Sequence, residues 1–347
     1  MRRKSRPRVA VVGLGMGRGH ARAAAENRKA DLIALCDIDQ EKLERHCTEL
    51  EVPNGYTDYK KMLRAERLDI VSVSLPNYLH KPVTVAALNA GAHVICEKPM
   101  AMNTREAEQM LAVARRTRRK LMINFSYRFT GEAKALKKVV DAGTVGEIYY
   151  GRTGWHRTRG IPKFGGWFAQ KKLSGGGPLI DLGVHRIDLA MMLMGDPKPV
   201  TISGMTYNKL GTSLARKARK PFDVEDLAVA MIRFDSGATL LVEVSWALNC
   251  ERREEMFTYL YGTKAGICHR NFGPGYDFEA CVFGEWDGTY VSSKIESTPG
   301  RENSMDHFID VVVDGVKPLT TPENGVNVMK VLDGIYKSAR LGKEIRI

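Results

Sequence analysis

The feature that most constrains the fold of this chain is an alternation of apolar runs and helical patterns over its first 125 residues. Runs rich in Val, Ile and Leu predict five strands, at 9–12, 32–36, 69–75, 92–96 and 121–125. Helical patterns follow at 21–27, 40–50 and 82–90, and behind Asn103, whose spacing from Glu106 is that of a capping box. Near-continuous apolar strands alternating with helices predict a parallel sheet covered on both faces.

The pattern changes after about residue 126, where the predicted strands become longer and few helices separate them. These strands lie at 148–154, 200–207, 226–234, 239–247 and 257–261, with helices near 131–142, 178–194, 303–314 and 324–341. The spacing favours a large, mostly antiparallel sheet. The sequence thus predicts an α/β protein of two domains, 1–125 and 126–347. In an alternative arrangement, the C-terminal helices pack back on the first domain.

Composition narrows the protein class. Hydrophobic residues make up 44% of the 347 residues, and no apolar run approaches the length of a membrane helix. The opening resembles a twin-arginine signal, but the apolar run behind it, 9–12, is too short for a signal core. The six cysteines form no C-x-x-C pair, which favours a reducing, cytoplasmic compartment.

The net charge of +13 comes from three clusters of five basic residues each, at 1–8, 115–120 and 209–220. Without these 15 residues, 38 basic groups face 40 acidic ones. No nucleic-acid-binding motif accompanies the clusters, so we expect solvated segments and no nucleic-acid partner. The 209–220 loop leaves three options open: contact with an anionic substrate, with a neighbouring subunit, or with water alone.

A glycine-rich turn joins the first predicted strand to the first helix. Such a turn lets backbone N–H groups approach a pyrophosphate at a helix N-terminus. The glycines are Gly13, Gly15, Gly17 and Gly19, and Arg18 stands where the G-x-G-x-x-G spacing places a glycine, so the loop is atypical and one residue shorter. Asp37 ends the second strand, where a carboxylate accepts ribose hydroxyls and disfavours a 2′-phosphate. This favours NAD over NADP.

Two further segments carry acid–base groups. Glu97-Lys98-Pro99 follows the 92–96 strand, whose carboxyl end should open on the ligand side of the sheet. Farther on, 175–177 is a triple glycine that would let a ligand approach the backbone, and it leads to Asp181 and His185. A spacing of four places this pair on one face of a helix. The pair is also compatible with a structural hydrogen bond or half a metal site, but no partnering histidine has a convincing spacing, so we expect no metal.

These segments together resemble the Gfo/Idh/MocA oxidoreductase family. The resemblance is carried by 13–19, Asp37, 74–77 with His80, 97–99, 127–129, 175–177 with Asp181 and His185, 224–226 and 335–339. It implies a Rossmann domain (1–125), followed by a substrate-binding domain (126–347) whose open sheet supports a homodimer or homotetramer. It also implies NAD(P)-dependent interconversion of hydroxyls and ketones on a sugar, cyclitol or sugar derivative.

Carried over position by position, the resemblance assigns a catalytic group of Lys98, Asp181 and His185. The expected cofactor neighbours are Gly13, Leu14, Gly15, Met16, Gly17, Arg18, Asp37, Leu75, Pro76, Asn77, His80, Glu97 and Lys98. Aromatic rings can stack on a sugar and arginine can hold hydroxyls. On that ground, the expected substrate contacts besides Asp181 and His185 are Tyr127, Arg128, His156, Arg159 and Trp167.

Two alternatives keep the cofactor but change the activity. One is a glycosidase that oxidises a sugar carbon transiently, eliminates the glycosidic substituent and restores the hydroxyl. The other is a non-catalytic, NAD-sensing binding protein. Net formation of NADH from a polyol separates a dehydrogenase from both.

Overall fold

The computed structural model describes residues 6–273, 275–297 and 302–347, so most of the basic opening segment, residues 1–5, lies outside the described residues. The chain divides into two compact units. Unit 1 comprises Met1–Phe125 and Glu302–Val326, and unit 2 comprises Ser126–Arg301 and Asn327–Ile347. The segment Glu302–Val326 thus groups with the N-terminal residues, although it lies near the end of the chain.

Within the described residues, unit 1 is built on a parallel sheet with the strand order β3-β2-β1-β4-β5-β6. The strands are β1 (Arg8–Val12), β2 (Asp31–Cys36), β3 (Asn54–Tyr56), β4 (Ile70–Val73), β5 (His93–Glu97) and β6 (Leu121–Asn124). The chain reverses its direction of winding between β1 and β4, as in doubly wound Rossmann folds. The predicted parallel sheet is confirmed, and the short β3 was not predicted.

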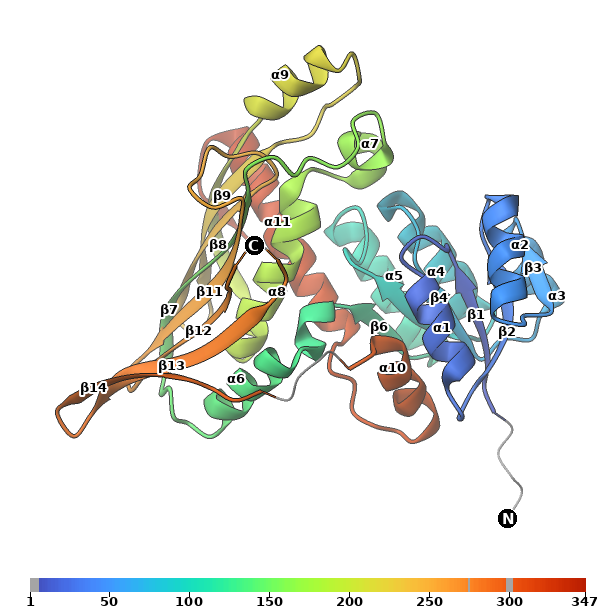
Figure 1. Ribbon diagram of the computed structural model, residues 1–347, viewed down its shortest axis with the longest axis horizontal. Coiled ribbons are helices and arrows are strands. Elements are labelled where there is room, and N and C mark those ends of the chain that lie inside the picture. Colours follow the sequence, from blue (N-terminus) through green and yellow to red (C-terminus); the bar gives the residue numbers. More distant parts are fainter. Residues whose placement is uncertain (1–5, 274, 298–301) are drawn as a thin grey trace. The chain divides into compact units, whose positions relative to one another are not determined.

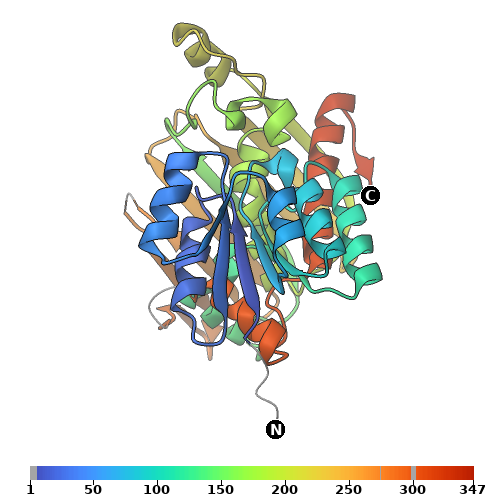
Figure 2. The same cartoon turned by 90° about the vertical axis from the view of Figure 1, so that its right-hand side faces the viewer.

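Helices cover both faces of this sheet, as Figure 2 shows. They are α1 (Arg18–Glu26), α2 (Gln40–Glu49), α3 (Tyr59–Ala65), α4 (His80–Asn89), α5 (Thr104–Thr117) and α10 (Ser304–Val313). The predicted cap of α5 is present, since the Asn103 side chain accepts the N–H of Glu106. The Glu106 carboxylate accepts the N–H of Met102, where a capping box would use Asn103.

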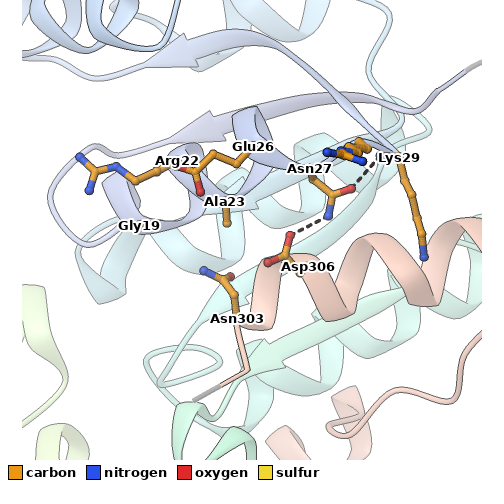
Figure 3. Close-up of a pocket in the computed structure, with 9 residues that line it drawn as sticks. Gly19, Arg22, Ala23, Glu26, Asn27, Lys29, Asn303 and Asp306 are labelled. Atoms are coloured by element: carbon orange, nitrogen blue, oxygen red, sulfur yellow. Dashed lines mark hydrogen bonds between the residues drawn. The ribbon is translucent and has the colours of Figure 1, made fainter. Parts of the chain in front are cut away.

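Helix α10 returns from the end of the chain to lie beside α1. The side-chain nitrogen of Asn27 donates to Asp306 at 2.6 Å, a contact drawn in Figure 3. Lys29 pairs with Asp310 and Asp314 on the same helix. These contacts explain why the segment groups with unit 1.

Unit 2 contains a mixed sheet, which within the described residues has the order β14-β13-β12-β11-β7-β10-β9-β8-β15. Only β7 and β10 pair in parallel, so the predicted mostly antiparallel sheet is confirmed. The strands are β7 (Ile148–Arg157), β8 (Pro199–Tyr207), β9 (Leu227–Phe234), β10 (Thr239–Ser245), β11 (Glu254–Gly262), β12 (Gly266–Asn271), β13 (Phe278–Trp286), β14 (Thr289–Lys294) and β15 (Ile345–Arg346).

Helices α6 (Gly131–Asp141) and α8 (Val184–Leu193) pack on one face of this sheet, where α11 also runs (Figure 1). Helix α11 (Pro322–Leu341) begins in unit 1 and continues in unit 2. The short α7 (Lys171–Ser174) precedes the triple glycine. The 209–220 segment, expected to be a loop, is largely helical and forms α9 (Leu210–Lys217). Ala215 is the buried side chain of this helix. The loop prediction was wrong because Leu210, Leu214 and Ala215 give that basic segment one apolar side.

The close packing of α1 on β1 depends on Gly17. A Cβ atom there would lie 2.1 Å from the carbonyl oxygen of Gly13 and 2.9 Å from the Cβ of Ser74. We therefore expect Gly17→Ala to lower the free energy of unfolding by about 1–3 kcal/mol, since the backbone must move to admit the methyl group. Urea unfolding measures the loss. Gly19→Ala is the matched control, because nothing lies within 4 Å of its added Cβ and alanine favours a helix. An equal loss in both variants would contradict the packing argument.

Candidate active site

The carboxyl ends of four neighbouring strands in unit 1 bring together most of the expected cofactor residues. The glycine loop follows β1, Asp37 follows β2, the 75–77 segment follows β4, and Lys98 follows β5. Because parallel strands end at the same edge of a sheet, these groups share the edge where doubly wound folds bind ligands.

Three glycines of the loop serve three different purposes: a turn with positive φ, an open backbone, and close packing of the helix on the strand. Gly13 has φ +91°, and its Cβ would lie 2.2 Å from the carbonyl oxygen of Ser74, so the turn admits only glycine. Gly15 has nothing within 4 Å of its Cβ position, which leaves its backbone open to a ligand. Gly17 meets the close approach of α1 to β1, and Arg18 is the first residue of the helix. The atypical spacing is therefore a shortened loop with the helix-packing glycine one position earlier.

Asp37 is fixed against this loop. One carboxylate oxygen accepts the N–H of Leu14 at 2.7 Å, and the other accepts the N–H of Asp39 at 3.0 Å. The ammonium of Lys42 lies 3.6 Å away. Since a carboxylate has about four lone-pair sites, two backbone bonds leave capacity for a ribose hydroxyl. The neighbouring Ile38 side chain is 91% exposed and offers an apolar surface beside that carboxylate.

Glu97 is held by a buried polar network. One of its carboxylate oxygens accepts the amide N–H of Asn124 at 2.6 Å. The same amide nitrogen lies 3.2 Å from Nε2 of His20, whose Nδ1 lies 2.7 Å from the Ser72 hydroxyl. Burial lowers the pKa of His20, against the opposing charge of Glu97. A neutral ring that accepts at Nε2 carries its proton on Nδ1, so His20 donates to Ser72 and orients Asn124 toward Glu97.

His80 lies between the segments that follow β4 and β5. It is fully buried, and its ring nitrogens lie 2.6 Å from the carbonyl oxygen of Pro99 and 2.7 Å from that of Leu75. These bonds tie the segment after β4 to the segment after β5. The geometry favours a positioning role for His80 over the direct cofactor contact expected from the sequence. Pro99 itself follows a cis peptide bond.

In unit 2, Asp181 and His185 lie on one continuous helical stretch. Asp181 belongs to a π-helical turn, Leu179–Gly183, and His185 is the second residue of α8. The indole N–H of Trp246 donates to the Asp181 carboxylate at 3.1 Å. The His185 ring lies edge-on to Tyr127, with 5.2 Å between centroids, and 6.1 Å from the ring of Trp155. Single π-turns within helices often occur at functional sites. No pattern in the sequence predicted this one.

Residues that the sequence interpretation missed surround this pair. The Arg157 guanidinium donates to Glu254 at 2.7 Å and to the hydroxyl of Tyr276 at 2.8 Å, and lies 4.9 Å from the ring of Trp155. Burial lowers the pKa of Arg157, but Glu254, Tyr276 and Asp181 outweigh it and raise the pKa overall. Alternation along β7 was the available signal: Thr153, Trp155 and Arg157 share one face.

Two expected substrate contacts are corrected by the structure. Arg128 is 3% exposed and holds the buried Asp188 through both Nε and Nη2, with a further bond to Asp196. Its guanidinium is thus occupied by an internal ion pair. His156 lies on the face of β7 opposite Trp155, because successive strand residues alternate. Its ring packs on Phe257, with Glu243 and Glu255 each 3.8 Å away.

The triple glycine also has a role other than the expected one. A Cβ at Gly176 would lie 1.9 Å from the Tyr336 hydroxyl, and one at Gly177 would lie 2.1 Å from the carbonyl oxygen of Glu225. The Glu225 carboxylate accepts the Tyr336 hydroxyl at 2.9 Å and the N–H of Leu179 at 3.1 Å. Gly176 and Gly177 therefore make room for the chain's own Tyr336 and Glu225, which hold the start of the π-turn, and ligand approach at the triple glycine stays a prediction.

The remaining expected substrate contacts occupy different surroundings. Tyr127 is buried beside His185, and its hydroxyl lies 3.5 Å from the sulfur of Met256. Trp167 stacks on Phe168 at 3.8 Å, and Phe168 lies edge-on to Trp246, the partner of Asp181. Arg159 donates to Asn249 at 2.9 Å. Their contact with a substrate stays a prediction.

Comparisons with known proteins match both units. A sequence model described as the oxidoreductase family, NAD-binding Rossmann fold, matches residues 7–125, and one described as the GFO/IDH/MocA C-terminal domain matches residues 133–268. D-glucoside 3-dehydrogenase of Escherichia coli (strain K12) is 31% identical over 352 residues, covering 98% of this chain and 97% of that protein.

Two further matches span nearly the whole chain. D-apiose dehydrogenase of Paraburkholderia graminis is 26% identical over 353 residues, covering 97% of this chain and 89% of that protein. The crystal structure of aldose-aldose oxidoreductase from Caulobacter crescentus has a TM-score of 0.83 and 26% identity, covering 99% of this chain and 100% of that one. The similarity therefore spans both units.

Proposed function

Because this chain belongs to the Gfo/Idh/MocA family of oxidoreductases, whose first domain is an NAD-binding Rossmann fold, we propose that it oxidises a ring hydroxyl of a sugar to a ketone. The family resemblance seen in the sequence motifs is confirmed. The dehydrogenase names of the relatives support the sugar class. The observation that carries the proposal is the Asp181 and His185 pair set among Trp155, Arg157 and Tyr276, a combination of acid–base, aromatic and guanidinium groups that suits a sugar.

The residues of unit 1 meet the needs of NAD. The open backbone at Gly15 admits a pyrophosphate, and Asp37 accepts ribose hydroxyls while disfavouring the 2′-phosphate of NADP. Bound NAD supplies the acceptor for the hydride that leaves the substrate carbon. Glu97, oriented by Asn124, holds the segment that carries Lys98.

The proton chemistry is assigned to Lys98 and His185. One of them accepts the hydroxyl proton, and the other stabilises the oxygen as negative charge develops on it. Asp181, held by Trp246, orients the group that acts as base. Arg157 holds neighbouring hydroxyls, and Trp155 or Tyr276 offers a ring face to the sugar.

The two alternative activities have less support. The relatives named above are dehydrogenases or oxidoreductases, which disfavours the glycosidase. The NAD-sensing alternative gives no role to the acid–base groups of Lys98, Asp181 and His185.

Initial-rate assays test the function. We expect repeated turnover of NAD to NADH with D-glucosides or free aldoses in a panel that also contains cyclitols and uronic acids, and slower turnover with NADP. Aryl glucosides run in parallel report bond cleavage. Cleavage of an aryl glucoside without net NADH would establish the glycosidase, and NADH binding with no turnover of any sugar would leave only the sensor.

Assembly and compartment complete the proposal. The sheet face opposite α8 carries aromatic side chains, including Tyr150, Tyr259 and Tyr261, which are frequent in protein interfaces. We assign this face to a homodimer or homotetramer contact. The six free cysteines support a cytoplasmic protein. Among the described residues, no helix is both long and apolar enough to cross a bilayer.

A further inference from the structure

Unit 1 contains a hollow of about 500 Å³ that the proposed reaction does not use. The end of α5, the start of β6, α10 and the 315–323 segment line it. Leu121 is the first residue of β6, so the hollow lies toward the amino end of this parallel strand. Ligands of doubly wound sheets bind at the carboxyl ends, where the glycine loop and Lys98 lie. The hollow is therefore separate from the expected cofactor edge.

The interior of the hollow is apolar. Met122, Phe308 and Val311 lie in its lining with almost no exposed surface, and Leu111 is a partly exposed apolar side chain there. Val316, which also lines it, is 44% exposed, and Pro318 and Pro322 complete the wall. Its volume lies within the range of about 300–1,000 Å³ for small-molecule sites. A small molecule with an apolar body thus has a matching surface.

The charge around the hollow is strongly one-sided. Its lining includes five cations against a single carboxylate, Glu323, a difference of +4. Four of these cations belong to the 115–120 cluster that the sequence left without a role, and the fifth is Lys317. Burial, together with the charges of Arg119 and Lys120, lowers the pKa of the nearby His93 to about 4, against the opposing charge of Asp69.

Among the described residues, three of the five cationic side chains have no hydrogen-bond or ion-pair partner. Arg115 pairs with Glu323 at 2.9 Å, and the Lys120 ammonium donates to the carbonyl oxygen of Val311. The side chains of Arg118, Arg119 and Lys317 make no hydrogen bond or ion pair within the part of the chain that the structure describes, although the backbone N–H groups of both arginines close the end of α5. An arginine without an internal partner at the rim of an apolar hollow can bind an external carboxylate.

A second groove in unit 1 provides a contrast. It lies along α1 and α10 and is lined by Arg22, Arg28 and Lys29 together with Glu26 and Asp306 (Figure 3). Its charges nearly balance, and Lys29 is already paired with Asp310 and Asp314. Unlike this groove, the hollow beside β6 combines an apolar lining with surplus cations.

We propose that this hollow binds an amphiphilic monocarboxylate, with its apolar tail against Val316, Pro318 and Pro322 and its carboxylate at Arg118 and Lys317. Each half of such a ligand finds its complement: the tail leaves water for apolar surface, and the carboxylate forms charge-assisted bonds at the rim. The size of the hollow favours a small molecule over a peptide segment.

Isothermal titration of the full-length protein with decanoate, below its micelle concentration, tests the proposal. We expect saturable binding at one site, unchanged by saturating NADH, and no comparable binding of decanol. The double variant Arg118→Glu with Lys317→Glu should weaken decanoate binding by about tenfold or more, because two attractive charges become repulsive. The matched control Lys217→Glu with Arg219→Glu makes the same charge change at the α9 cluster and should bind as the wild type does.

Several results would overturn the proposal. These are no decanoate binding to the wild type, equal weakening in both double variants, displacement by NADH, or equal binding of decanol. Thermal unfolding of the variants shows that each is folded, and both charge changes are on exposed side chains. A third variant, Val316→Asp, should weaken binding through the apolar wall and must lose affinity if the tail occupies the hollow.

Discussion

Replacing Lys98 by methionine is expected to lower kcat by about 10²–10⁴-fold, the usual contribution of a positioned acid–base group. Methionine keeps much of the apolar stem but removes the ammonium. Binding of NADH should change little, because the glycine loop and Asp37 follow other strands, β1 and β2. Steady-state kinetics give the loss in kcat, and fluorescence titration gives the NADH affinity.

Lys61→Met is the matched control for this experiment. Lys61 is an exposed lysine of α3, and the same chemical change there should leave kcat unaltered. A Lys98→Met enzyme that turns over at a near-normal rate would remove Lys98 from the mechanism. A variant that loses NADH affinity and activity in parallel would assign Lys98 to cofactor binding.

Replacing Arg128 by methionine is expected to lower the free energy of unfolding by about 3–5 kcal/mol, because it leaves a buried carboxylate without its partner. Asp188 is 0% exposed, and Arg128 is its bidentate ligand. Urea unfolding near neutral pH measures the loss. A variant as stable as the wild type but with a raised KM for sugars would restore Arg128 to the substrate site.

The stability that Arg128→Met loses should increase as the pH rises. Burial raises the pKa of Asp188 to about 6, although the Arg128 charge opposes the rise. An aspartate with a folded pKa above its unfolded value costs stability as the pH rises through the interval between them. Without Arg128 the folded pKa moves higher, so this interval extends further. The gap in stability between wild type and variant should therefore widen as the pH rises above about 6.

A double replacement separates the lost charge pair from lost packing. Arg128→Met with Asp188→Leu removes both buried charges, and such exchanges are often neutral or stabilising. We expect it to recover much of the stability that Arg128→Met loses. A double variant less stable than the single one would show that packing, and not the uncompensated carboxylate, dominates.

The sequence predicted the parallel sheet of unit 1 well because each long strand there is a continuous apolar run. It missed β3, a three-residue strand without such a run, and α3 after it. It also missed β12, β13 and β14. All side chains of β14 except Val291 are exposed, and β13 contains two glutamates and a glycine, so apolar alternation is weak in these strands. Their pairing is a property of the assembled sheet.

The candidate site divides in the same way. Motif order alone selected the glycine loop, Asp37, Lys98, Asp181 and His185 as candidates, and each lies at or near the end of a strand or the start of a helix. Side-chain partners were not predictable, because they lie far apart in sequence: Arg128 and Asp188 are separated by 60 residues. Gly176 likewise meets Tyr336, and Gly177 meets Glu225. Which face of β7 lines the site could not be predicted either, because it depends on where α8 packs. That face carries Trp155 and Arg157.

A crystal structure of the enzyme with NADH and a sugar that it turns over tests the central claim most directly. We expect the Lys98 ammonium and a ring nitrogen of His185 to lie within about 2.6–3.2 Å of one and the same carbinol oxygen, whose carbon faces the nicotinamide. A sugar bound with only one of these groups in reach, or with both turned away from its reacting carbon, would contradict it.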